Sequence, residues 1–487
     1  VTVAGTSFSD IENLIGSDTQ IDTFNLIAGN IDSTVTGGTN TTDRIVNQLT
    51  AATDWDIDGI NAVTVAGTSF SDIENLIGSD TQIDTFNLIA GNIDGSVSGG
   101  ANTTDIIVNQ LTAATDWNIT GVNQVTVAGI TFTGIENLTG SDTEIDTFNL
   151  QAGNIDGTVT GGINMTDEIV NQLTTATAWD ITGVNEVTVA DTDFTGIENL
   201  TGSVTEIDTF NLQAGNIDGT VTGGTNTTDE IVNQLNTDTA WSISGINEIS
   251  VAGTIFSEIE NLTGASIVDT FTFTSPGSIT GLVNGGSGVD EINLPAVDTT
   301  VQLGAVTGNT TNSILEVNNI ENIIANSANN NILIGGDTPI NWFINGSGSG
   351  SVGGLALTVT PTVGATIFSN FLTLNGGAGA DTFEIVSNDI STILFTINGG
   401  TGVNLTDYDT LIGPNIDTTW TIDSLNSGTL VNSDATGVIN IKFNEMENLK
   451  AGSGDDTFAF FNEVDGSVDA GTHTTGDTID LSNLVVV

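Results

Sequence analysis

The chain repeats itself every 62 residues over its first half, and this period limits the fold more than any other feature. The stretch GSDTQIDTFNL at residues 16–26 returns unchanged at residues 78–88, and with small changes from Gly140 and Gly202. Phenylalanine keeps the same step at Phe8, Phe70, Phe132, Phe194 and Phe256. A fixed period of this length is typical of arrays in which each repeat packs on its neighbours.

A shorter rhythm inside each repeat indicates strands. Asp or Asn, then any residue, then an apolar residue opens a short alternating run at Asp22, Asp43, Asn61 and Asp84. Alternation with period two, bounded by turns rich in Gly, Asn and Asp, favours strands over helices. We therefore predict an all-β fold, a right-handed parallel β-solenoid (β-helix) with about 21 residues per coil and three coils per 62-residue repeat. Residues of the Phe8, Phe24 and Ile45 type would then stack in its interior.

The second half of the chain keeps this plan in a degenerate form. Residues 1–264 carry the regular repeats, and residues 265–487 are expected to continue the same solenoid, with Trp342 and Trp420 in the place of Trp55. The spacing from tryptophan to the next phenylalanine is longer there, and the extra residues are rich in Gly and Ser. Loop insertions are therefore expected near residues 345–360 and 423–438.

The net charge of the chain indicates which classes of partner it would attract or repel. Its 61 acidic and three basic residues give a formal net charge of −58. Nucleic acids and anionic membrane surfaces would be repelled, whereas cations would be attracted. No apolar run is long enough for a transmembrane helix, so we expect no membrane insertion. The absence of cysteine excludes disulfides and thiolate metal sites.

The recurrent aspartates admit three interpretations. They can cap turns by bonding to nearby main-chain groups, they can form a solubilising acidic surface, or they can bind calcium. If coils align, carboxylates such as Asp22 and Asp43 stand one coil apart, and their mutual repulsion favours a bound cation. Calcium takes six to eight oxygen ligands and is the natural choice. The candidate ligands in the regular repeats are Asp22, Asp43, Asp84 and Asp105.

Glycine-rich turns in the second half resemble a known calcium motif. GGSGVD at residues 285–290 and GGAGAD at 376–381 match GGxGxD in full, and AGSGDD at 451–456 lacks one glycine. These stretches resemble the haemolysin-type (RTX) calcium-binding repeat. The resemblance implies calcium held by turn carbonyls and by carboxylates, here Asp290, Asp381, Asp455 and Asp456. That family runs its repeats in tandem, whereas the matches here are isolated.

At a wider scale the chain resembles the repeat regions of large bacterial surface adhesins and exoproteins. FSDIENLIGSDTQIDTFNL and LNGGAGADTFEI are the stretches that show it. The resemblance implies an extracellular location at the cell surface and an elongated stalk, often stiffened by calcium.

These observations predict a structural protein and no enzyme. The expected role is a rigid acidic rod, either as the stalk of an adhesin or as the subunit of a surface filament or sheath. The rod would associate end to end with other copies or continue in a longer chain. Alternatives are a carbohydrate-binding adhesin region that recognises cell-surface glycans, and a polysaccharide-acting β-helix enzyme with paired carboxylates.

Single residue types leave further alternatives open. His473 is the only histidine and is expected at the surface. The tryptophans either fill the core or stack on sugars, and their phase with apolar neighbours favours the core. Asn-x-Thr triplets are either glycosylation acceptors or ordinary turns, and turns are preferred; examples begin at Asn40, Asn102 and Asn226.

Overall fold

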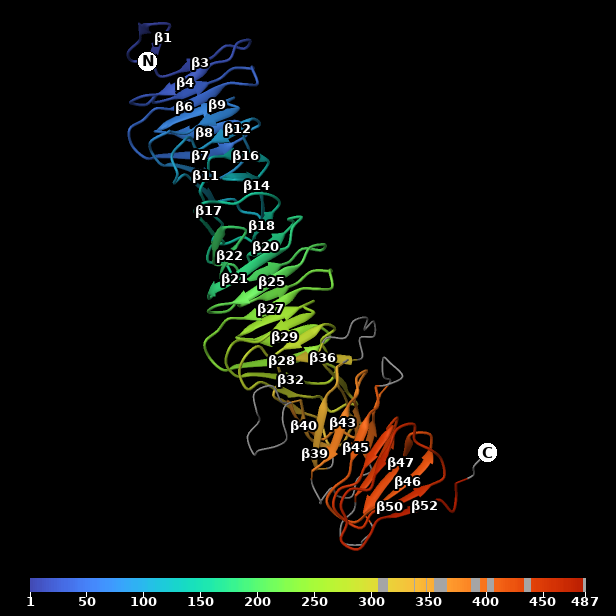
Figure 1. Ribbon diagram of the computed structural model, residues 1–487. Helices are drawn as coiled ribbons and strands as arrows, with labels where there is room; N and C mark the ends of the chain where they lie inside the picture. The colour runs from blue at the N-terminus through green and yellow to red at the C-terminus, as the bar shows by residue number, and fades with distance from the viewer. Residues whose placement is uncertain are drawn as a thin grey trace. The chain divides into compact units, whose positions relative to one another are not determined.

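The computed structural model describes residues 1–304, 314–336, 338–346, 348–353, 366–386, 395–400, 407–432 and 439–484. These residues form short strands joined by turns, with no helix among them (Figure 1). The chain divides into a first unit, Val1–Ile231 with Ala252–Glu258, and a second unit, Val232–Val251 with Ile259–Val487. Parallel pairing of regularly spaced strands dominates each unit, which confirms the predicted all-β solenoid.

In the first unit the strands are β1 (Thr2–Val3), β2 (Thr6–Ser7), β3 (Leu14–Ile15), β4 (Thr23–Leu26), β5 (Thr34–Thr36), β6 (Arg44–Asn47), β7 (Thr53–Gly59), β8 (Ala62–Val65), β9 (Thr68–Ser71), β10 (Asn75–Ile77), β11 (Asp84–Leu88), β12 (Ser96–Ser98), β13 (Ile106–Asn109), β14 (Thr115–Gly121), β15 (Gln124–Val127), β16 (Ile130–Thr133), β17 (Asn137–Thr139), β18 (Asp146–Leu150), β19 (Thr158–Thr160), β20 (Glu168–Asn171), β21 (Thr177–Gly183), β22 (Glu186–Val189), β23 (Thr192–Thr195), β24 (Asn199–Thr201), β25 (Asp208–Leu212), β26 (Thr220–Thr222) and β30 (Thr254–Ser257). The division between the units falls within β27 (Glu230–Asn233).

In the second unit the strands are β28 (Thr239–Gly245), β29 (Glu248–Val251), β31 (Asn261–Thr263), β32 (Asp269–Phe273), β33 (Leu282–Asn284), β34 (Glu291–Asn293), β35 (Thr300–Leu303), β36 (Ile314–Asn318), β37 (Asn322–Ile324), β38 (Ile332–Ile334), β39 (Asn341–Gly346), β40 (Ser349–Val352), β41 (Thr366–Ser369), β42 (Thr373–Asn375), β43 (Thr382–Ile385), β44 (Phe395–Asn398), β45 (Thr410–Ile412), β46 (Thr418–Ser424), β47 (Ser427–Asn432), β48 (Asn440–Asn444), β49 (Asn448–Lys450), β50 (Thr457–Phe460), β51 (Val468–Asp469) and β52 (Thr478–Asp480).

Two sheets build the first unit, and the chain alternates between them. One sheet pairs β5 with β9 and β7 with β11, and then continues through β13, β17 and β19. The other pairs β4, β6, β10, β12 and β16 in that order. Phe24 pairs with Ile45, and Leu76 pairs with Val97. In both pairs the partners are 21 residues apart in the sequence, which is the predicted length of a coil. The predicted stacking of Phe24 on Ile45 is therefore confirmed.

Each repeat also contains a three-stranded antiparallel hairpin that the sequence rhythm did not reveal. Strand β7 pairs with β8 and β8 with β9, both antiparallel, so the chain turns back twice within one sheet. Strand β9 returns to lie beside β5. Strand β7 lies beside the later β11 (Figure 1). The sequence predicts that Asn61 opens an alternating run, but in the structure it adopts a φ of 51° in the hairpin turn. Asparagine suits that backbone conformation, so its recurrence reflects turn chemistry.

The hairpin changes the predicted count of three coils per repeat. Between β9 and β14 the chain passes through β10, β11, β12 and β13, which belong to the two sheets in turn. It therefore crosses between the sheets an odd number of times per repeat. The hairpin of β7–β9 lies in one sheet and that of β14–β16 in the other. One repeat makes a whole number of coils plus half a coil, so residues 62 apart lie on opposite sheets.

Stacked side chains fill the space between the sheets. Trp55, Trp117 and Trp179 are fully buried, which confirms the core interpretation of the tryptophans. Trp117 stacks on Phe148 with ring centroids 5.6 Å apart, and Phe148 meets Phe194 edge to face at 5.9 Å. Such pairs add about 0.5–1.5 kcal/mol to the burial of their area. Phe8 differs from its equivalents, because its side chain is 47% exposed.

The second unit repeats this plan with more variation. Trp342 and Trp420 are fully buried and stack on Phe383 and Phe458 at 5.3 Å, as expected from the sequence. Parts of the two expected insertions are hairpin strands, since β39 pairs with β40 and β46 with β47. Residues 354–360 and 433–438 of those insertions lie outside the described residues.

Replacing Trp117 by alanine should lower the free energy of unfolding by about 3–5 kcal/mol, because the cavity cannot be filled by neighbouring coils. Asp116 is the matched control. It is exposed on the same strand, and Asp116→Ala should stay within about 0.5 kcal/mol of the wild type. Urea denaturation followed by circular dichroism would measure both. Equal midpoints for the two variants would contradict the packing described.

Candidate functional site

Buried acidic side chains line one corner of the coils, at the point where a strand begins. Asp84 and Asp105 are each 0% exposed and Glu136 is 5% exposed. The main-chain N–H of Asp84 donates to Asp105 Oδ1 (2.8 Å), and that of Asp105 donates to Glu136 Oε2 (3.1 Å). Successive coils are therefore joined by a column of carboxylates. We call these three positions the first aspartate, the second aspartate and the glutamate of a column.

The first aspartate of each column has many hydrogen-bond donors. Asp84 Oδ1 accepts from Trp55 Nε1 and from Asn47 Nδ2, both at 2.7 Å, and Oδ2 accepts from the Ser79 main-chain N–H at 2.5 Å. Burial raises the pKa of Asp84 above its ordinary value, and these hydrogen bonds oppose that rise. Asp146 and Asp208 repeat the arrangement one and two repeats later.

The second aspartate has fewer donors. Asp105 accepts through Oδ1, while Oδ2 is buried without a hydrogen-bond partner. Burial, together with the nearby charges of Asp84 and Glu136, raises the pKa of Asp105 to about 7. Burial similarly raises the pKa of Asp290 and of Asp381 to about 6. Two acids with the same side chain thus meet different surroundings within one column.

The glutamate ties the column to the hairpin turn. Glu136 Oε1 accepts from Asn123 Nδ2 (3.1 Å), and Asn123 has a φ of 50° between β14 and β15. Burial raises the pKa of Glu136. This glutamate belongs to an Ile-Glu-Asn stretch that recurs in each repeat, and it is not among the predicted site residues. Its fixed distance of 31 residues from the second aspartate was the available signal.

Glycine is required beside each aspartate for a steric reason. A Cβ on Gly78 would lie 2.8 Å from Asp84 Oδ2 and closer still to the carbonyl oxygen of Gly99 on the neighbouring coil. A Cβ on Gly285 would lie 2.7 Å from Asp290 Oδ2. The carboxylate therefore occupies the space that a side chain would need. The repeated glycine-to-aspartate spacing is explained by this packing.

The predicted calcium ligands do not share one environment. The buried ones are Asp43, Asp84, Asp105, Asp290, Asp381 and Asp456, whereas Asp22 is half-buried at the start of the first unit. The main-chain N–H of Asp22 donates to Asp43 Oδ1, as that of Asp84 donates to Asp105 Oδ1. Oδ2 of Asp43 and of Asp456 is also without a hydrogen-bond partner. Asp455, which directly precedes Asp456 in the chain, is half-buried and contacts residues 474–476.

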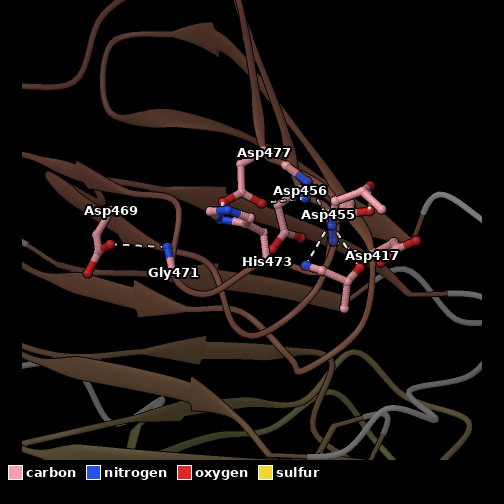
Figure 2. Close-up of polar contacts among 10 residues, drawn as sticks. Asp417, Asp455, Asp456, Asp469, Gly471, His473 and Asp477 are labelled. Carbon is pink, nitrogen blue, oxygen red and sulfur yellow. Dashed lines mark hydrogen bonds and ion pairs between the residues drawn. The ribbon is translucent and has the colours of Figure 1, made fainter.

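Asp455 holds a turn through its carboxylate. Oδ1 accepts from the main-chain N–H groups of Thr474 (3.0 Å), Thr475 (2.7 Å) and Gly476 (3.1 Å), as Figure 2 shows in part. These hydrogen bonds and that of the Thr475 hydroxyl lower the pKa of Asp455. Asp477 lies beside them, since His473 Nδ1 is 3.2 Å from Asp477 Oδ2 (Figure 2). The single histidine is thus exposed and paired with a carboxylate.

The fit of calcium to these groups can be judged from their donors. Both oxygens of Asp84 already accept N–H groups, and Asp105 offers a single oxygen. Calcium requires six to eight oxygens. Within the described ranges no three acidic or histidine side chains converge as a metal site would need. Hydrogen bonds thus engage three of the four carboxylate oxygens of Asp84 and Asp105. Calcium binding by the predicted ligands stays a prediction.

The asparagines of the Asn-x-Thr triplets make turns. Asn40 Oδ1 accepts from the Thr42 main-chain N–H (2.9 Å), and Asn102 does the same with Thr104 (2.9 Å). Asn226 Nδ2 in addition donates to Asp229 Oδ1 (2.7 Å). These contacts agree with the preferred interpretation of the triplets as turns.

Comparison with known protein-family models finds no match, and comparison with curated proteins finds no significant similarity. In the part of the chain that the structure covers, no helix has the length and hydrophobicity to cross a membrane.

Replacing Trp179 by phenylalanine should destabilise the protein by about 1–3 kcal/mol, because buried Asp208 loses a donor. Trp179 Nε1 lies 2.6 Å from Asp208 Oδ1. Losing this donor raises the folded-state pKa of Asp208 further, so the loss of stability should be larger at pH 8 than at pH 5. Thermal denaturation at the two pH values would measure the effect.

Trp342 provides the control. Its ring stacks on Phe383 in the same manner, but its Nε1 has no hydrogen-bond partner among the described residues. Trp342→Phe should therefore lack the additional loss at pH 8. A similar pH dependence in both variants would argue against the role given to the Trp179 N–H.

Proposed function

We propose that the chain is a structural repeat region, an acidic spacer located outside the cell. Its use would be as the stalk of a surface adhesin or as the subunit of a surface filament or sheath. The observation that carries the proposal is the continuity of stacking within each unit. In the first unit Phe24, Ile45, Leu76, Val97 and Phe132 pair one above another across five strands.

The polar groups also support a structural role. The most buried carboxylates are used in joining coils, as between Asp84, Asp105 and Glu136. The remaining acids contribute to a charge of −58, which keeps copies apart in solution and attracts cations. The resemblance to adhesin repeat regions suggests the extracellular setting, and calcium as the cation is a prediction of the same resemblance.

Small-angle X-ray scattering of the purified protein tests the extended form that a spacer requires. A compact domain of 487 residues would have a radius of gyration of about 23 Å. We expect a clearly larger value, because coils are added along one direction. A value near 23 Å would contradict the proposal.

Two further measurements separate the versions of the proposal. Negative-stain microscopy would show fibres if the protein is a filament subunit and separate particles if it is a stalk. Millimolar calcium should raise the Tm if cation binding stiffens the turns, with magnesium as the control. Release of reducing ends from polysaccharides, or binding to a defined glycan, would instead favour an enzyme or a carbohydrate-binding region.

A further inference from the structure

The Asn-x-Thr triplets are a motif that the spacer function leaves unused. At Asn102 the side-chain Oδ1 accepts from the main-chain N–H of Thr104 (2.9 Å) and from the hydroxyl of Thr104 (2.6 Å). Asn40 has the same two contacts with Thr42, at 2.9 Å and 2.7 Å. Both donors must face the amide oxygen, so the amide nitrogen of each asparagine points away from the threonine.

The amide nitrogens of Asn40 and Asn102 are accessible. In the described part of the chain neither Nδ2 forms a hydrogen bond, and neither nitrogen is buried. Asn102 lies in the turn between β12 and β13, and its neighbours Ala101 and Thr103 are exposed. An enzyme can therefore reach this nitrogen without opening a strand.

Two other copies of the turn engage their amide nitrogen. Asn164 Nδ2 donates to the carbonyl oxygen of Glu144 (2.6 Å) and to Asp167 Oδ1 (2.9 Å). Asn226 Nδ2 makes the corresponding pair of hydrogen bonds. The threonine hydroxyl is also farther from the asparagine Oδ1 in these turns, at 3.1 Å and 3.2 Å. A group attached to either nitrogen would displace the partners that it now contacts.

Asn40 and Asn226 form a matched pair, because the sequence around them is the same. Residues 37–43 and 223–229 both read GGTNTTD. Only the surroundings of the amide nitrogen differ, since that of Asn226 contacts the preceding coil. A difference in reactivity between the two asparagines would therefore come from packing and not from local sequence.

Further triplets begin inside strands. Asn118 in β14 pairs with residues of β15 and β18, and Asn137 in β17 pairs with a residue of β13. Asn199 in β24 and Asn261 in β31 have similar places. Their main chain belongs to a sheet, so it cannot turn around the asparagine as it does at Asn102.

The two threonine donors suit a transfer reaction at the asparagine. An amide nitrogen is a weak nucleophile, because its lone pair is shared with the carbonyl group. When Nδ2 bonds to carbon and loses a proton, negative charge develops on Oδ1. At Asn102 the N–H and the hydroxyl of Thr104 point at that oxygen and stabilise the developing charge.

We propose that Asn40 and Asn102 are acceptor sites for N-linked glycosylation, and that Asn164 and Asn226 are not. The co-reactant is a phosphate-activated sugar, delivered by a glycosyltransferase of the cell that makes the protein. Nδ2 attacks the anomeric carbon, so that a C–N bond forms and the C–O bond to the phosphate breaks. The phosphate leaves with the bonding electron pair, and a base of the transferase takes one Nδ2 proton.

The test uses the folded full chain with UDP-glucose and a purified glycosyltransferase, chosen because it modifies the free peptide GGTNTTD. Peptide mass spectrometry then locates the sugar. Digestion is directed at acidic residues, because the chain has only three basic ones for trypsin. We expect glucose on Asn40 and Asn102, and none on Asn164 or Asn226. Transfer to Asn226 at the rate of Asn40 would overturn the proposal, and so would a folded chain that accepts no glucose.

Two variants test the part played by the threonine hydroxyl. Thr104→Val should slow transfer to Asn102 by about 100-fold, as expected when one donor to a developing oxyanion is lost. Thr104→Ser should restore the transfer, and Asn40 should react equally in both variants. The Tm should stay near that of the wild type, because Thr104 is exposed. Equal rates for Thr104→Val and the wild type would contradict the role given to the hydroxyl.

Protein purified from the cells that make it should carry sugar at the same two asparagines. If Asn40 and Asn102 are both unmodified in that material, the triplets are turns only and the proposal is wrong. The proposal does not require the spacer function. The scattering result bears on that function alone, so the two proposals can fail separately.

Discussion

The buried carboxylates have to receive their hydrogen bonds from neighbouring coils, and this requirement fixes how the coils lie on one another. Asp84 draws on Trp55 and Asn47, which precede it by 29 and 37 residues. A shift of one residue in the strand register would turn each of these side chains to the opposite face. The buried acids would then lose their donors, which costs far more than the bonds contribute when formed. Polar groups in the interior thus specify a single register that apolar stacking alone would leave less defined.

The hairpin has a geometric consequence for everything on the surface. Because the hairpin keeps three consecutive strands in one sheet, the chain crosses between the sheets an odd number of times per repeat, and equivalent residues in consecutive repeats lie on opposite sheets. The exposed side chains Ile60 and Val122 at the tips of two successive hairpins belong to this alternation. In the first unit a given surface side chain of the repeat therefore lies on one sheet in every second repeat. It lies on the other sheet in the repeats between.

The columns also affect how much charge the fold has to accommodate. Asp84 and Asp105 lie next to each other in a column, and in the described part of the chain neither forms an ion pair with a basic residue. Removing water from such a group disfavours its charged form. The glycines complete the arrangement, because a side chain at Gly99 or Gly285 would displace the carboxyl group. The motif that resembles a calcium turn thereby serves to close the corner of a coil.

The sequence by itself determined the repeat, the strands and the stacked core. These features can be read from the 62-residue period, the two-residue alternation and the phase of the tryptophans. They correctly predicted that Trp55 is buried and that Phe24 stacks on Ile45. The tertiary structure decided the half coil per repeat, because whether Asn61 opens a coil or a hairpin depends on which strand β8 pairs with. It also decided the surroundings of each aspartate. Asp84 and Asp105 open similar stretches of sequence, but two of the donors to Asp84, from Trp55 and Asn47, lie 29 and 37 residues away, and no local pattern encodes those two contacts.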